Sequence, residues 1–284
     1  MDDDIIWSGT DFPYACLIDR NRTLTYKKAI LETVKPGDIT VDIGSGSGIL
    51  AFFAAEAGAK KVYAVEIDHF LAESLRQSVR ANSLEDIIEI VEGDALQVKL
   101  PMNADVVLAE IIETGLLEEM QLKVMNELRR KGVIGGKTKV LPAGYETFIK
   151  LVDIDNSFYG YKIMAPMHDW PYYSDAKNGW EQVKKQDITE PQSLGYFDFQ
   201  SQIVSPDVDV TLDIDIPAGK QANGIELSGM AHLTSSVLLG ATNAFNGPKI
   251  LYIDPVAGPH KFKLRIDYSM GKGLGTINFR QLSV

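Results

Sequence analysis

Three closely spaced glycines limit what this chain can fold into more than any other feature. They lie in the segment 42–48, DIGSGSG, between a strand-like apolar run at 38–43 and a helical apolar run at 49–57. Because glycine has no Cβ, a ligand can approach the backbone closely there, where the positive end of the helix dipole faces it. The segment predicts the first strand, turn and helix of an α/β fold that binds a nucleotide-like cofactor.

The rest of the first half continues to alternate between strand and helix periodicity. The strand-like runs lie at 61–67, 87–91 and 104–108, and the helical ones at 70–81 and through Leu117, Met120, Val124 and Leu128. This order is typical of a parallel, doubly wound, Rossmann-like sheet.

The hydrophobic period changes to two after Pro142. Residues 208–216 and 262–268 alternate apolar with polar side chains, as antiparallel strands with one exposed face do. We therefore expect two domains, residues 1–142 and a mostly antiparallel β domain at 143–284. Residues 156–192 show no clear period, which predicts loops and one short helix.

The spacing of the glycines separates two classes of cofactor. A dinucleotide fingerprint, G-x-G-x-x-G, needs a third glycine where this chain has Ile49. Gly44, Gly46 and Gly48 instead form G-x-G-x-G, with Asp42 two residues before the first glycine, which is the arrangement of Rossmann-like methyltransferases. A carboxylate there disfavours a pyrophosphate and suits the amino group of a methionyl moiety. The prediction is S-adenosylmethionine, with S-adenosylhomocysteine as product.

Two further acids follow the next strands. Glu66 ends the second strand, where a carboxylate can accept both ribose hydroxyls, although dinucleotide folds share this feature. Asp94 follows the third strand, where its side chain can accept from the adenine amine, whereas an isolated Gly-Asp is more often a turn. In series with the glycines, both acids are predicted to bind the cofactor.

Composition excludes several other classes. The net charge of -11 repels phosphate backbones, so nucleic acid is not the expected partner and a protein with a basic segment is. One cysteine, Cys16, and four scattered histidines predict neither a disulfide nor a metal site. Neither a basic signal-like start nor an apolar run of membrane-spanning length is present, so a cytoplasmic protein is expected.

The segment 41–66, VDIGSGSGILAFFAAEAGAKKVYAVE, closely resembles the corresponding segment of protein arginine methyltransferases, and 19–26 resembles the helix before the first strand in that family. The resemblance implies that Arg22 pairs with the cofactor's carboxylate, a contact suited to a guanidinium. It also implies that the second half is a β-barrel-like domain for substrate binding and dimerisation, which allows a homodimer.

Glu110 and Glu119 lie nine residues apart, the spacing of the family's two catalytic glutamates. By resemblance, the two carboxylates grip a guanidinium so that one nitrogen points at the methyl group. Glu118 is a rival for the second position. The alternative role for both Glu118 and Glu119 is structural, because acids in a first helical turn stabilise the helix dipole.

The chain departs from the family in two places. The Thr-His-Trp loop should fall near 243–249, which contains no histidine, and the N-terminal Tyr-Phe motif is absent, with Trp7, Phe12 and Tyr14 as possible substitutes. Methyl transfer to a nitrogen of a protein side chain, arginine first, is the leading hypothesis. RNA or a small molecule as acceptor, and a cofactor-binding partner protein without turnover, stay open as alternatives.

Overall fold

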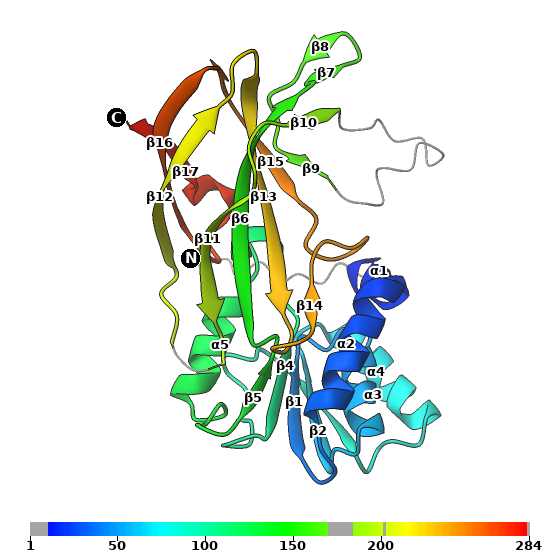
Figure 1. Cartoon of the computed structure of the whole chain (residues 1–284). Coiled ribbons are helices and arrows are strands. Elements are labelled where there is room, and N and C mark those ends of the chain that lie inside the picture. The colour runs from blue at the N-terminus through cyan, green and yellow to red at the C-terminus, as the bar shows by residue number, and fades with distance from the viewer. Residues whose placement is uncertain (1–10, 170–183, 201–202, 283–284) are drawn as a thin grey trace.

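A five-stranded parallel sheet forms the lower part of the molecule in Figure 1. The structure, a computed structural model, describes residues 11–169, 184–200 and 203–282. The strand order is β3-β2-β1-β4-β5, with all four neighbouring pairs parallel. The strands are β1 (Ile39–Ile43), β2 (Lys61–Glu66), β3 (Ile88–Glu92), β4 (Val106–Ala109) and β5 (Lys139–Leu141). The chain adds β2 and β3 on one side of β1 and then β4 and β5 on the other. The order of the strands therefore reverses between β1 and β4, the place where open α/β sheets bind ligands.

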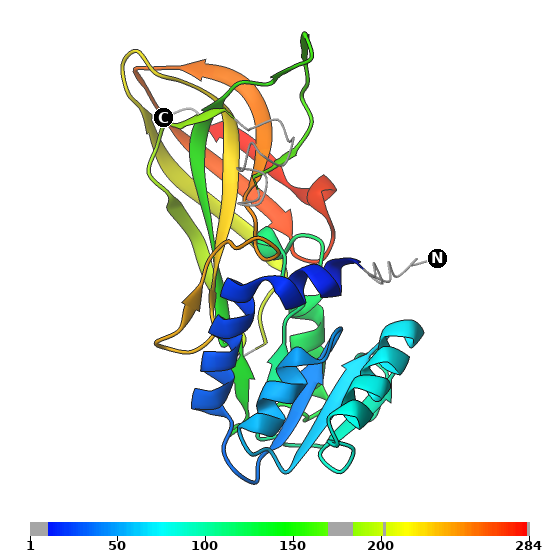
Figure 2. The same cartoon turned by 90° about the vertical axis from the view of Figure 1, so that its right-hand side faces the viewer.

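Helices cover both faces of this sheet, with α2 to α4 on one side and α5 on the other (Figures 1 and 2). They are α1 (Asp11–Ile18), α2 (Arg20–Thr33), α3 (Ile49–Glu56), α4 (His69–Ala81) and α5 (Gln121–Arg130). In α4, Ala72, Leu75 and Val79 are buried at spacings of three and four residues, and the Asp68 side chain caps the first turn by accepting from the Leu71 N–H at 2.9 Å. None of the described helices is long and apolar enough to cross a bilayer.

The second half of the chain forms antiparallel sheets that lie above the parallel one (Figure 1). The larger sheet contains β6 (Gly144–Ile154), β9 (Met167–His168), β10 (Lys185–Asp187), β11 (Gln192–Asp198), β13 (Gln221–His232), β14 (Leu238–Leu239) and β15 (Lys249–Ala257). A smaller sheet pairs β12 (Asp207–Ile216), β16 (His260–Ser269) and β17 (Asn278–Leu282). This arrangement confirms the predicted fold class, a Rossmann-like parallel sheet followed by antiparallel β structure.

The helix predicted through Leu117 begins later than the periodicity indicated. Residues 114–116 form a 3-10 turn, η1 (Thr114–Leu116), in which Gly115 and Leu116 have φ of 80° and 56°, and α5 starts at Gln121. Positive φ values cannot continue a right-handed helix, so the apolar spacing was misleading there. Leu117 is nevertheless fully buried.

The short helix expected within 156–192 is not found in residues 156–169 and 184–192, and because residues 170–183 lie outside the described part of the chain, it stays a prediction there. Residues 156–169 and 184–192 contain strands, among them the hairpin β7 (Ser157–Phe158) and β8 (Tyr161–Lys162). Tyr159 and Gly160 at its tip both have positive φ, 54° and 87°, which is what a tight two-residue hairpin turn requires.

Candidate active site

The glycine turn and Glu110 lie next to each other at the switch point of the parallel sheet. Ile43 at the end of β1 pairs with Ala109 at the end of β4, so Gly44 and Glu110 follow adjacent strands. Carboxyl ends of parallel strands share one edge of a sheet, and the predicted cofactor and catalytic residues meet at that edge.

The backbone of the turn requires glycine. Gly44, Gly46 and Gly48 have φ of 66°, 51° and 81°, and Gly48 is the N-cap of α3. A Cβ on Gly48 would lie 2.2 Å from the Leu75 Cδ1 atom, and one on Gly44 would lie 2.8 Å from the Ile111 Cγ2 atom. The turn is therefore packed tightly against both α4 and the segment that follows β4.

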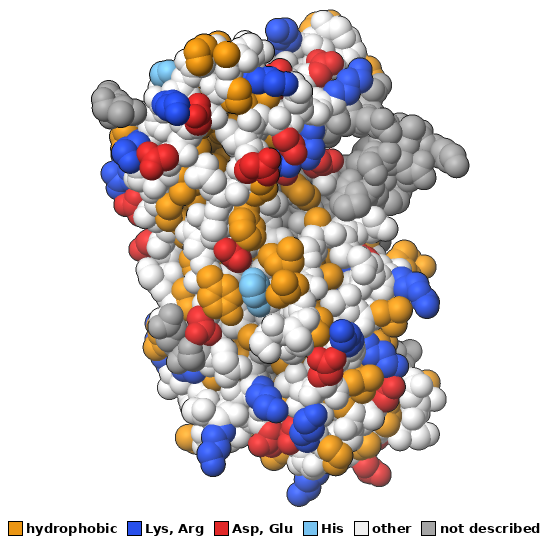
Figure 3. Space-filling view, in the orientation of Figure 1, with side chains coloured by type: hydrophobic (Ala, Val, Ile, Leu, Met, Phe, Trp, Pro, Cys, Tyr) orange, Lys and Arg blue, Asp and Glu red, His pale blue; other side chains and the backbone are white. Residues whose placement is uncertain are grey.

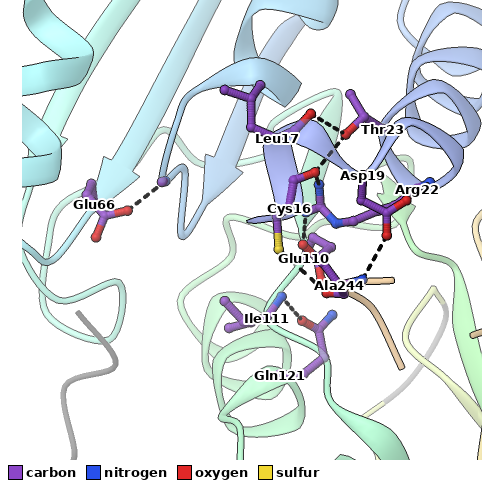
Figure 4. Close-up of polar contacts among 11 residues, drawn as sticks. Cys16, Leu17, Asp19, Arg22, Thr23, Glu66, Glu110, Ile111, Gln121 and Ala244 are labelled. Atoms are coloured by element: carbon purple, nitrogen blue, oxygen red, sulfur yellow. Dashed lines mark hydrogen bonds and ion pairs between the residues drawn. The ribbon is translucent and has the colours of Figure 1, made fainter. Parts of the chain in front are cut away.

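Glu66 holds this turn against the end of β2, as Figure 4 shows. Its Oε2 atom accepts the Gly46 N–H at 2.7 Å and its Oε1 atom accepts the Asp68 N–H at 3.0 Å, and the residue is 5% exposed. Each carboxylate oxygen can accept a second hydrogen bond. Glu66 thus orders the glycine turn and keeps acceptor capacity for a pair of hydroxyls.

Asp42 is buried on β1, directly before the turn. Burial is the main cause that raises the pKa of its carboxyl to about 7, with the nearby Glu66 charge acting in the same direction. The Asp42 Oδ2 atom is buried without a hydrogen-bond partner among the described residues. A buried orphaned acceptor fits a bound cationic group, because such a group would satisfy the oxygen and favour its charged form.

Asp94 has local partners in this structure. Its Oδ1 atom accepts the Leu96 N–H at 2.8 Å and its Oδ2 atom accepts from the Gln97 side-chain amide at 3.1 Å. These bonds form the turn after β3. The contact between Asp94 and an adenine amine stays a prediction.

Arg22 and Glu110 form a buried ion pair, which the sequence analysis did not anticipate because it gave them separate roles. The Arg22 guanidinium contacts the Glu110 carboxylate and donates to the Cys16 carbonyl at 3.3 Å (Figure 4). It also lies over the Tyr26 ring. The two side chains are 5% and 10% exposed. The Asp19 side chain caps α2 by accepting the Arg22 N–H at 3.2 Å, so the start of this helix positions the guanidinium.

Glu119 and Glu118 have different surroundings. Glu118 pairs with Lys249 at 2.7 Å, whereas the Glu119 Oε2 atom is buried and lacks a hydrogen-bond partner in the described part of the chain. Burial and then the neighbouring Glu113 charge raise the pKa of Glu119 to about 7, while Lys249 and Arg22 act in the opposite direction. Glu119 is therefore the better placed of the two rivals to receive an external cation.

The segment near 243–249 contacts the site although it has no histidine. Its Ala244 N–H donates to the Asp19 carboxylate at 2.8 Å, and its Phe245 ring packs edge-on against Tyr26 with centroids 6.3 Å apart. Of the aromatic residues considered near the N-terminus, Phe12 and Tyr14 lie on α1 with 43% and 63% of their surface exposed, and Trp7 lies outside the described residues.

Sequence reasoning missed several site residues. Gln121 is fully buried, and its side-chain oxygen accepts the Ile111 N–H at 3.3 Å. Cys16 and Lys249 also lie near the glutamates of the 110–119 segment, although both come from segments far away from it in the chain. The only sequence signal for Lys249 was its position directly before the apolar residues of strand β15, where a charged side chain is unexpected. No group of three or more His, Cys, Asp or Glu side chains in the described ranges is arranged to hold a metal ion.

Comparisons with known proteins agree with this arrangement. Residues 23–136 match the family model of the ribosomal protein L11 methyltransferase, PrmA. The uncharacterized protein MJ1452 of Methanocaldococcus jannaschii is 31% identical over 266 residues, which cover 93% of this chain and 94% of that protein. Protein arginine N-methyltransferase PRMT10 of Oryza sativa subsp. japonica is 42% identical over 105 residues, covering 36% of this chain and 27% of that protein.

The same fold is found in a solved structure. The Trypanosoma brucei PRMT1 enzyme-prozyme heterotetrameric complex with AdoHcy contains a chain with a TM-score of 0.72 and 19% identity, and the match covers 95% of this chain and 96% of that one. The similarity therefore extends through both the parallel and the antiparallel sheets.

Proposed function

We propose that this chain methylates a nitrogen of a protein side chain, with arginine the first candidate. It belongs to the family of MJ1452 and to the protein arginine methyltransferase-like class I S-adenosylmethionine-dependent methyltransferases. The observation that carries the proposal is the pair of acids, Glu110 and Glu119, beside Arg22 at the switch point of the sheet. The names of the matched family and of the rice relative both specify proteins as acceptors, which supports a protein substrate.

The residues of the turn suit S-adenosylmethionine, which supplies an electrophilic methyl group when bound. In the proposal, Asp42 accepts from the amino group, Glu66 accepts the two ribose hydroxyls and Asp94 accepts from the adenine amine. Arg22 has donors beyond those used for Glu110 and Cys16, since its Nε–H is buried without a described partner. It can therefore hold the cofactor's carboxylate and orient Glu110 at the same time.

Glu110 and Glu119 would bind the acceptor from two sides. Their negative charges balance a cationic acceptor and hold its nitrogen in line with the methyl group, and this alignment is the main requirement of a direct displacement. Glu119, with a pKa of about 7, can also take up a proton after transfer.

The test is to incubate the protein with radiolabelled S-adenosylmethionine and a cell extract, and to follow the label into protein, RNA and small molecules. Label is expected in protein. Glu110→Gln should lower the rate on the order of 100-fold because the acceptor loses its alignment, with cofactor binding nearly intact. Glu127→Gln is the matched control, since Glu127 lies on α5 and pairs with Arg130.

The other outcomes separate the alternatives. Label in RNA that survives protease would overturn a protein acceptor, and label in small molecules would indicate a metabolite. Tight binding without transfer to any fraction would indicate a partner protein without turnover. A Glu110→Gln protein as active as wild type would refute the two-glutamate clamp.

The acceptor is proposed to carry a basic segment. The net charge of -11 favours such a partner, although Figure 3 shows Lys and Arg interspersed with Asp and Glu over one face of the molecule. On that face the charges are mixed, and the attraction is assigned to the acids of the site. Raising the salt concentration should weaken substrate binding only modestly.

A homodimer is proposed through the β7–β8 hairpin. Tyr159 and Tyr161 are 85% and 72% exposed on this hairpin, and tyrosine is enriched in protein interfaces. Light scattering should show a dimer for the wild type and a monomer for the double variant Tyr159→Ser, Tyr161→Ser. A wild-type protein that is monomeric at tens of micromolar, roughly the range in which weak complexes form, would contradict this assignment.

A further inference from the structure

Lys249 is a buried lysine with two glutamate partners. It is the first residue of β15 and its side chain is 4% exposed. Its Nζ atom lies 2.7 Å from the Glu118 Oε2 atom and also contacts the Glu113 Oε2 atom. A buried ammonium group is costly without such partners, so these contacts fix the position of both acids.

The two acids belong to the segment that carries the proposed catalytic pair. The Glu113 Oε1 atom accepts the Glu118 N–H at 2.8 Å, which closes the segment around η1. The Thr114 hydroxyl donates to the Gly247 carbonyl at 2.6 Å, two residues before Lys249. The end of the 243–249 segment therefore holds this loop through both its backbone and the lysine.

The four glutamates between 110 and 119 are consequently not equivalent. Glu110 pairs with Arg22, and Glu113 and Glu118 pair with Lys249. The Glu119 Oε2 atom remains buried without a partner among the described residues. The charged and titratable groups around Glu119 are Glu113, Glu118, Lys249, Arg22 and the Cys16 thiol, with His168 of β9 next to Lys249.

We propose that Lys249 is a positioning residue for methyl transfer, which binds Glu113 and Glu118 and so leaves Glu119 as the carboxylate free to contact the cationic acceptor. The inference rests on the proposed function. Without the ammonium, three neighbouring carboxylates would repel one another, and the charged form of Glu119 would become less favourable. Lys249 would thus act both by holding the loop and by keeping Glu119 ionised near neutral pH.

The experiment compares charge changes of opposite sign. Lys249→Met should move the acidic limb of the kcat/KM profile to higher pH by roughly one unit, because losing the positive charge near Glu119 raises the pKa of its carboxyl. Glu118→Gln should move the limb downward, because a like charge is lost, and Lys249→Arg should restore most of the wild-type profile. Lys263→Met is the control, since Lys263 pairs with the exposed Asp213 on the smaller antiparallel sheet.

A direct titration separates this inference from the proposed function. Carboxyl carbon NMR of glutamate-labelled protein, with the Glu119 signal assigned from Glu119→Gln, gives the midpoint of Glu119 without any turnover. The Lys249→Met midpoint is expected above that of the wild type, even if no acceptor is ever methylated. A wild-type protein that transfers no methyl group would overturn the proposed function alone.

The inference fails if a folded Lys249→Met protein keeps both the wild-type Glu119 midpoint and the wild-type pH profile, even when its activity falls. If Lys249→Met does not fold, Glu118→Gln decides the question. A downward shift in that variant supports the inference, and an unchanged midpoint overturns it.

Discussion

Gly48→Ala tests the tightest contact of the glycine turn. Gly48 has φ of 81°, and an alanine Cβ would lie 2.2 Å from the Leu75 Cδ1 atom and 3.3 Å from the Phe52 Cε2 atom. Leu75 is 1% exposed in the packed face of α4, where a densely packed core resists displacement of its side chain. The substitution therefore adds a steric clash to an unfavourable backbone conformation.

The two effects can be estimated separately. A left-handed conformation costs a residue with a Cβ about 1–2 kcal/mol. Overpacking a filled core by a methyl group costs about 1–3 kcal/mol. Gly48→Ala should therefore lower the free energy of unfolding by about 2–5 kcal/mol, a large part of the total stability of an average domain.

Gly219→Ala is the matched control. Gly219 lies in the turn between β12 and β13 with φ of 74°, and a Cβ there would meet no described atom within 4 Å. Its cost should be the backbone cost alone, about 1–2 kcal/mol. The difference between the two variants isolates the clash with Leu75.

Urea unfolding measures both variants, and calorimetric titration with S-adenosylmethionine measures the site. Gly48→Ala should also weaken cofactor binding, because displacing the N-terminus of α3 moves the turn, whereas Gly219→Ala should bind normally. Equal destabilisation by the two substitutions would show that α3 and α4 do not approach each other at Gly48 as described.

Two further predictions concern buried charges. The pKa of Asp42 in the folded protein, about 7, lies above its usual 3.8, because the buried carboxyl favours the protonated form. The contribution of Asp42 to the free energy of unfolding is therefore largest below about pH 4 and is lost as the pH rises through 7. Asp42→Asn should flatten the fall in unfolding free energy of the ligand-free protein over that range, and identical pH slopes in urea melts would contradict the assignment. Arg22→Met should cost about 3–5 kcal/mol, because it leaves the Glu110 carboxylate buried without its partner. The double variant Arg22→Met, Glu110→Gln should lose less than the sum of the single variants, and strict additivity in urea melts would argue against a coupled pair.

Local patterns were sufficient for most of the fold. The alternation of strands and helices before Pro142 and the period of two after it predicted the parallel and antiparallel sheets, because burial on one face imposes a fixed period on each element. Patterns failed where backbone conformation overrode periodicity. Gly115 and Leu116 have positive φ and interrupt the helix expected through Leu117. The division into domains at residue 142 stays a prediction.

The sequence by itself determined where the residues proposed to hold the cofactor lie. Asp42 and Glu66 are at or near the ends of β1 and β2, Gly44, Gly46 and Gly48 follow β1, and parallel pairing brings these strand ends to one edge. The tertiary structure alone decided how the charges of that site are paired. Arg22 meets Glu110 across 88 residues, and Lys249 meets Glu118 across 131. Such pairs have no local periodicity, because each depends on how the antiparallel half and α2 pack against the segment after β4. That packing, and not the spacing of the glutamates, distinguishes Glu119 from its neighbours.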